Sequence, residues 1–539
     1  MIMDLVLKGD AVFTGLKDEP ERLAVGIRGN RIEKVCPPEE MEPYIGPETD
    51  IRDYGGRLIM PGFFDGHEHA FLGGIFGRAA DLSGCASEQE AARRVKDFAD
   101  AHPELSWIIG TDWSNIEWGQ ARRPRKETLD ALLPDTPVYL IDAEGHSAWL
   151  NSAAIALSGV ADVEEFGDDL VARDPDGSPT GYIAETSMLM VARLAFDMPM
   201  PVQEVIFDEF QRRTASLGIT SVSNIQCYQG SGIDVGNVAV VKQFEREGRL
   251  NVRFFFAAGL TGDLERPRRL RQEYDSDKVR FSGLKHIVDG TATGWTALLL
   301  EPYADKPDSV GSSRIPAEEL ARRVVDADRE GFRVRMHACG DGSVRRALDC
   351  CELAQKRNGK RDSRHTIEHI EIIAKEDIGR FAQLGVVASM QPDHIGICEK
   401  FADNPYFARL GERRAAETWP IRSILETGAH VQFGTDFPIY DNNPMLALYR
   451  GTTRLFNDGR PEGGWNPSEK VTMAQLLKGY TAGSAYGAFM EDRVGTLEEG
   501  KYADIVVLDH NLFALNEARE ILETAPVLTL MDGRIVYER

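Results

Sequence analysis

Short apolar runs alternate with helical patterns through the middle of the chain. Amphipathic stretches at residues 317–329, 343–356 and 375–383 lie between runs that have the length and composition of buried strands. Strands that alternate with helices are typical of βα units, and eight such units predict an α/β fold, a (β/α)8 TIM barrel. The eight expected strands are residues 63–69, 220–224, 252–256, 284–289, 333–337, 366–369, 386–390 and 431–436.

Both ends of the chain show a different pattern, one of short strands separated by tight turns. Residues 5–35 carry four such runs, and residues 527–537 flank an Asp532-Gly533 dipeptide that is typical of a hairpin. Neither set is large enough to be stable alone, so we expect both ends to fold together as one small β-sandwich. The predicted domains are residues 1–59 and 486–539 for the β-sandwich and residues 60–485 for the barrel.

Residues 71–200 interrupt the βα rhythm. They contain two strand-like runs, 107–110 and 138–142, and a polar hairpin-like segment around residues 174–178. We interpret them as a long insertion after the first barrel strand, placed over the active site, because long loops at that face of a barrel usually carry binding function.

Composition and charge narrow the class of protein. Hydrophobic residues make up 42% of the 539 residues and charged residues 27%, as in an ordinary soluble enzyme. A formal net charge of -24 argues against nucleic-acid or anionic-membrane partners. The seven cysteines follow no disulfide or zinc-ribbon spacing, which favours a reducing compartment. No run is long enough to cross a membrane and the N-terminus lacks a signal-peptide pattern, so we expect a cytoplasmic location.

His67 and His69 stand at the end of the first predicted barrel strand. Alternate residues of a strand share a face, so the two imidazoles point the same way and can bind one divalent metal ion. The alternative is a strand end with two solvated histidines.

Other predicted strands also end in residues that can bind metal. The active site of a TIM barrel lies at the C-terminal ends of its strands. Taken singly, each of these residues could be a buried, hydrogen-bonded group or a helix cap, but their shared position at one end of the barrel favours a metal centre. They are Lys285, His337, His369 and Asp436.

Together these motifs resemble the amidohydrolase superfamily, in its amidohydrolase-3 (YtcJ-like) branch, which includes N-substituted formamide deformylases. The resemblance extends over nearly the whole chain. It implies a metal-dependent hydrolase that acts on a carbon–nitrogen bond other than a peptide bond, in an amide or an N-acyl or N-formyl compound. The matching segments are residues 61–69, 145–152, 283–290, 337–341, 367–369, 433–436 and 495–504.

The resemblance implies two divalent metal ions, with zinc as the expected metal. His67 and His69 would bind one ion, and His337 and His369 would bind the other. Lys285 would be carbamylated and bridge the two ions, because an unmodified ammonium group would repel them.

The resemblance also implies catalytic roles. Asp436 would contact the first ion, take a proton from the water that becomes a metal-activated hydroxide, and deliver it to the leaving nitrogen. His146 follows a strand-like run in a matching context, and we expect it to stabilise the developing oxyanion. The alternative for His146 is a structural role in the insertion.

Three further residues are candidates for lining the pocket of a small-molecule substrate. Trp295 stands in residues 289–296, where the family often has a Ser/Arg-containing stretch, Trp113 lies in the insertion, and His394 follows the seventh strand. Structural packing is the alternative for the tryptophans. The resemblance also leads us to expect a homodimer.

Two rival functions stay open. A deaminase of a ring amine on the same fold would need one metal ion and an unmodified Lys285. A catalytically silent, metal-binding regulatory protein would have no need of the base Asp436, which is present.

Overall fold

The computed structural model describes residues 2–539 except 116–117, 119–121, 144 and 165–169. The chain divides into two compact units. The larger unit comprises residues 1–69, 208–232 and 241–539, and the smaller comprises residues 70–207 and 233–240. The placement of the insertion over the active site stays a prediction.

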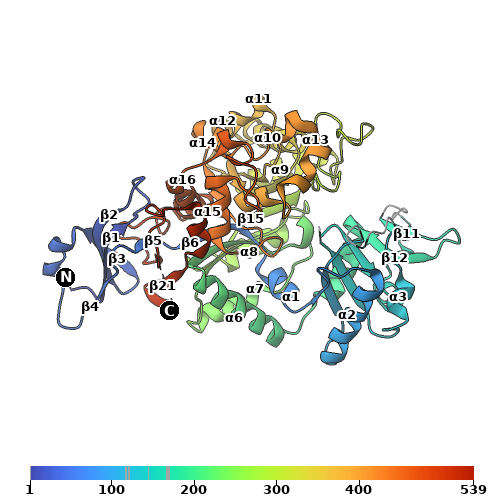
Figure 1. Cartoon of the computed structure of the whole chain (residues 1–539), viewed down its shortest axis with the longest axis horizontal. Helices are drawn as coiled ribbons and strands as arrows, with labels where there is room; N and C mark the ends of the chain where they lie inside the picture. The colour runs from blue at the N-terminus through green and yellow to red at the C-terminus, as the bar shows by residue number, and fades with distance from the viewer. Residues whose placement is uncertain (1, 116–117, 119–121, 144, 165–169) are drawn as a thin grey trace. The chain divides into compact units, whose positions relative to one another are not determined.

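Eight parallel strands form the barrel of the larger unit, which confirms the predicted (β/α)8 fold (Figure 1). Their side chains are almost all buried, as expected for parallel strands covered on both faces. Hydrogen bonds link them in the order β19-β18-β17-β16-β15-β14-β13-β6. The strands are β6 (Phe63–Glu68), β13 (Ile219–Ile225), β14 (Arg253–Gly259), β15 (Val279–Ile287), β16 (Val334–Ala338), β17 (Thr366–His369), β18 (Val387–Met390) and β19 (Val431–Phe433).

Helices alternate with these strands. The predicted helix at residues 317–329 has those bounds, and its buried face includes Leu320, Val324 and Val325. The segment 375–383 forms two short helices instead of one. The helices of this unit are α8 (Glu265–Glu273), α9 (Ala317–Arg329), α10 (Asp341–Asn358), α11 (Lys375–Ile378), α12 (Arg380–Leu384), α13 (Pro405–Ala415), α14 (Ile421–Glu426), α15 (Pro444–Thr453), α16 (Met473–Lys478) and α17 (Ser484–Gly487), while α6 (Met200–Ser216) and α7 (Val238–Arg246) contribute residues to both units.

Both chain ends join one β-rich domain, as predicted, and hydrogen bonds connect its eight strands into a single sheet. The two ends meet where β5 pairs antiparallel with β20, with Met60 opposite Val506. At the hairpin between β21 and β22, Asp532 and Gly533 both have positive φ, 56° and 74°. The strands are β1 (Leu5–Val12), β2 (Glu21–Arg28), β3 (Arg31–Cys36), β4 (Asp50–Asp53), β5 (Leu58–Pro61), β20 (Ile505–Leu508), β21 (Pro526–Met531) and β22 (Arg534–Glu538).

The smaller unit is a six-stranded mixed sheet with helices. The hairpin predicted around residues 174–178 is the turn between its strands β11 and β12. Trp113, Trp118 and Trp149 pack together in its core, and the indole N–H of Trp113 donates to the Leu140 carbonyl oxygen at 2.9 Å. Packing therefore accounts for Trp113, which is 1% exposed. The elements are α1 (Ala70–Phe76), β7 (Ala80–Asp81), α2 (Glu88–Ala101), β8 (Ile108–Trp113), α3 (Lys126–Asp130), β9 (Val138–Asp142), β10 (Ser147–Leu150), α4 (Ser152–Ser158), β11 (Val171–Arg173), β12 (Pro179–Ala184) and α5 (Met188–Ala195).

All seven cysteines are free thiols. Among the described residues, none of the helices combines the length and the apolar character needed to span a membrane.

Candidate metal centre

The histidines and the aspartate predicted from the sequence meet at the carboxyl end of the barrel strands. His67 lies on β6 and His69 just beyond it, His337 lies on β16, His369 ends β17, and Asp436 follows β19. Parallel strands of a barrel present their carboxyl ends at the same rim, which is why residues far apart in the sequence lie close together.

Asp436 and the two histidines of the first strand form the tightest group. The Asp436 Oδ1 atom lies 3.0 Å from His67 Nε2 and 3.1 Å from His69 Nε2. The backbone joins the same segments, because the Asp436 N–H donates to the His67 carbonyl oxygen at 2.8 Å and the His69 N–H donates to the Phe437 carbonyl oxygen at 2.7 Å. One carboxylate oxygen and two imidazole nitrogens thus converge on one position.

Asp436 is held in its ionised form. Burial opposes the charge, but the positive potential of His67 and the hydrogen bonds from His67 and His69 outweigh it and hold the pKa of Asp436 well below its ordinary value. The carboxylate is therefore ionised at neutral pH, the form in which a carboxylate binds a metal ion.

A residue that the sequence analysis missed, Asp65, holds this rim in place. Its carboxylate accepts the backbone N–H groups of His67 at 3.0 Å and Thr435 at 3.1 Å, and the Thr435 hydroxyl. Burial raises the pKa of Asp65 to about 6. Asp65 therefore ties β6 to the segment that carries Asp436.

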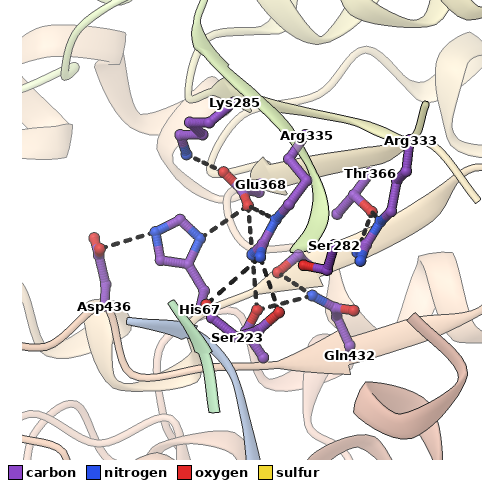
Figure 2. A network of polar contacts seen from close by, with 12 residues as sticks. His67, Ser223, Ser282, Lys285, Arg333, Arg335, Thr366, Glu368, Gln432 and Asp436 are labelled. Carbon is purple, nitrogen blue, oxygen red and sulfur yellow. Dashed lines mark hydrogen bonds and ion pairs between the residues drawn. The ribbon is translucent and has the colours of Figure 1, made fainter. Parts of the chain in front are cut away.

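Glu368 is a second missed residue, and it occupies the centre of a buried ionic network (Figure 2). One of its oxygens lies 3.1 Å from His67 Nδ1 and accepts a 2.7 Å hydrogen bond from Arg335, while the other contacts the Lys285 ammonium group. A carboxylate on Nδ1 orients an imidazole so that Nε2 faces a metal ion. In the sequence, Glu368 could be noticed only as an acidic residue directly before His369.

The backbone at the end of β17 brings two consecutive residues to the same place. Successive residues of a regular strand point to opposite faces. His369 has φ 75°, in the left-handed region, so the strand departs from extended geometry at that residue. This departure allows both Glu368 and His369 to approach His67, whose ring centroid lies 5.1 Å from that of His369.

Lys285, the predicted carbamate bridge, is buried on β15 and pairs with Glu368. Its nitrogen therefore contacts a carboxylate in this structure.

His337 faces a different set of neighbours. Its ring centroid lies 4.2 Å from that of His369, yet its Nε2 lies 3.3 Å from the Cys339 sulfur and 3.9 Å from an Asp289 oxygen. Asp289 in turn accepts the backbone N–H groups of Cys339 and Gly340, at 3.1 and 3.0 Å. These bonds fix the loop that follows β16.

The other predicted residues differ in their surroundings. His394 Nε2 lies 3.8 Å from Asp436 Oδ2, so the structure brings His394 to the centre. Burial lowers the pKa of His394 to about 4, which keeps its ring neutral at pH 7. The Cζ atom of the Arg409 guanidinium lies 3.5 Å from the centroid of the Trp295 ring. The indole N–H of Trp295 donates to Asp305 at 3.0 Å.

His146 lies in the smaller unit, where its Nδ1 is 3.0 Å from a Glu185 oxygen. Its expected contact with a substrate in the barrel stays a prediction.

The donor atoms suit a divalent transition-metal ion. Neutral imidazole nitrogens combined with carboxylate oxygens are the ligands that zinc and related ions bind in catalytic sites. The ligand atoms of His67, His69 and Asp436 lie within 4.8 Å of one another, as do those of His369, His394 and Asp436.

Comparisons with known proteins identify the family and the fold. The sequence model of the amidohydrolase family matches residues 50–537. The chain is 28% identical to Protein LONG AFTER FAR-RED 3 of Arabidopsis thaliana, over 100% of this chain and 92% of that protein. It is 24% identical to the N-substituted formamide deformylase of Arthrobacter pascens, over 96% and 95% of the two chains. The crystal structure of a metal-dependent hydrolase from Pyrococcus horikoshii OT3 has the same fold, with a TM-score of 0.76 at 24% identity over 95% of this chain and 98% of that one.

Proposed function

The chain belongs to the amidohydrolase family, and we propose that it is a metal-dependent hydrolase that cleaves a carbon–nitrogen bond other than a peptide bond in a small molecule. The observation that carries this proposal is the convergence of His67 Nε2 and His69 Nε2 on one oxygen of Asp436, at 3.0 and 3.1 Å. A relative named as an N-substituted formamide deformylase favours amides and N-acyl or N-formyl compounds as the substrate class.

The first metal ion, zinc in this proposal, would be held by His67, His69 and Asp436. For a second ion the family resemblance gives His337 and His369, with a carbamylated Lys285 as the bridge. Bound divalent ions would lower the pKa of a water molecule and polarise the carbonyl group of the substrate.

Residues of the chain then supply the proton transfers and the positioning. Asp436, ionised and next to both histidines, accepts the proton of the attacking water and returns it to the leaving nitrogen. Glu368 holds the His67 ring with Nε2 toward Asp436. His146 is proposed as the donor that stabilises the developing oxyanion.

A second candidate function is deamination of a ring amine. The observation in its favour is that His67, His69 and Asp436 form a compact group that could hold one ion by itself. A centre built on His67, His69 and Asp436 alone would hold one ion, as this rival expects.

Turnover of a substrate panel by the metal-loaded enzyme and by an Asp436→Asn variant tests the proposal. The panel contains N-formyl amines, N-acyl amines and amino-substituted heterocycles. We expect release of a carboxylic acid and an amine, and a loss of about 10²–10⁴-fold in the variant, which lacks the base. Release of ammonia from the heterocycles alone would support the deaminase, and no turnover with metal bound would support the silent regulatory protein.

A further inference from the structure

His394 carries a buried ring nitrogen that has no hydrogen-bond partner among the described atoms. The residue lies in the short 3-10 helix Pro392–Gly396 that follows β18, and its side chain is 7% exposed. The ring nitrogen without a partner among these atoms is Nε2. A neutral imidazole that carries its proton on Nδ1 has a lone pair on Nε2 that can bind a metal ion.

The Nε2 atom of His394 lies close to Asp436. Nε2 is 3.8 Å from Asp436 Oδ2, whereas His67 and His69 approach Asp436 Oδ1. The His394 ring stacks with two other rings, with centroids 4.1 Å from Tyr440 and 5.9 Å from His369 and interplanar angles of 25° in both cases. These ring contacts restrict the ring plane without using Nε2.

The ligand atoms of His369, His394 and Asp436 all lie within 4.8 Å of one another. His337 forms a comparable group with Asp289 and Cys339 instead. His394 is therefore placed at least as well as His337 to share an ion with His369.

We propose that His394 is a metal ligand, which together with His369 and Asp436 holds a divalent ion beside the one at His67 and His69. This inference rests on the proposed metal-dependent function. Asp436 would then contribute to both positions, since its Oδ1 atom faces His67 and His69 and its Oδ2 atom faces His394.

Metal binding by the full-length chain tests this ligand directly. The protein is stripped with a chelator and reloaded with Co²⁺, and the metal per chain is measured by plasma mass spectrometry together with the visible absorption of bound Co²⁺. We expect wild type to hold two equivalents. We expect His394→Asn to lose one equivalent, or to bind it at least tenfold more weakly, with a changed Co²⁺ spectrum.

His286 provides a matched control. It is also buried, its Nε2 also lacks a hydrogen-bond partner among the described atoms, and burial lowers its pKa to about 3. None of the potential metal-binding groups found among the described residues includes it. His286→Asn should therefore leave the metal content and the Co²⁺ spectrum unchanged.

A second variant keeps the test decisive if His394→Asn folds poorly. His394→Cys replaces an imidazole ligand with a thiolate. A thiolate bound to Co²⁺ gives a near-ultraviolet charge-transfer band. Cys339 is present in both proteins, so we expect the variant to show this band and wild type to lack it. Full metal content with an unchanged spectrum in His394→Asn, and no new band in His394→Cys, would overturn the inference. If the His394 variants gave these negative results but Asp436→Asn still lost metal, the proposed function would stand without the His394 inference. Wild type that binds no metal would refute both the inference and the proposed function.

Discussion

Two buried polar clusters in the larger unit differ in how completely their groups are partnered. At one, Arg253 is fully buried and forms two hydrogen bonds to Asp504, at 2.6 and 3.0 Å, and one to Asp532, at 3.2 Å. The backbone N–H of Asp532 also donates to Asp504 at 2.8 Å. This cluster joins barrel strand β14 to the β-rich domain formed by the two chain ends.

The cluster around Asp436 has the opposite character. Two imidazoles share one of its oxygens, and a third imidazole, that of His394, keeps a nitrogen without a hydrogen-bond partner among the described atoms. A buried polar group without a partner costs about 1–3 kcal/mol, so such a group needs an explanation. A cluster whose groups are all paired stabilises the fold, whereas one that leaves a buried imidazole nitrogen beside a carboxylate without a partner is arranged for a ligand.

The largest effect is expected from Asp436→Asn. Activity should fall by about 10²–10⁴-fold because the base is lost. The free energy of unfolding of the metal-free protein should also fall, by about 1–3 kcal/mol, because the variant disturbs the buried contacts of His67 and His69 with this carboxylate. Steady-state kinetics and urea unfolding measure the two quantities, and an active variant would remove Asp436 from the mechanism.

Arg253→Met should produce the reverse pattern. It leaves Asp504 and Asp532 as buried carboxylates without their guanidinium partner, which should cost about 3–5 kcal/mol of stability. Metal content should stay at the wild-type value. Loss of metal at unchanged stability would mean that the two clusters do not divide their roles in this way.

Metal removal should lower the stability of wild type by a smaller amount. A ligand that binds only the folded state at about 100 times its Kd contributes about 2.7 kcal/mol. Thermal unfolding with and without chelator should show this shift, and Asp436→Asn should show a clearly reduced one. Equal shifts in both proteins would place the metal elsewhere.

The smallest expected effect is on the loss of stability at acid pH. Burial opposes the charge on Asp532, but Lys278 and Arg253 outweigh it and lower its pKa. The unfolded chain therefore binds a proton before the folded one does, so the stabilisation is present above the ordinary aspartate pKa of about 3.9 and is lost as the pH falls below it. Urea unfolding at several pH values should show a shallower acid slope for Asp532→Asn than for wild type, and parallel slopes would exclude this contribution.

The sequence predicts the barrel well because its strands are continuous apolar runs. All eight expected strands are present, although β15 begins at Val279, before the expected start, and continues through Gly283. At the N-terminus, Gly9-Asp10 suggests a turn, but β1 runs unbroken from Leu5 to Val12 with an irregular register between Gly9 and Val12. A bulge and a turn use similar residues, so the pattern alone does not separate them.

The partners of the site residues are much harder to predict. Glu368 contacts His67, Arg335 and Lys285 from three other strands, and those contacts depend on strand register and on the left-handed backbone at His369. A sequence pattern carries neither. For the same reason the position of His394 after the seventh strand could be predicted, but not the direction of its Nε2.

We propose that the rim around Asp436 binds divalent metal. Metal content per chain, measured by plasma mass spectrometry on wild type and on Asp436→Asn after identical loading with Zn²⁺, tests it most directly. We expect bound zinc in wild type and the loss of at least one equivalent in the variant. Wild type without metal, or a variant that keeps the full complement, would contradict it.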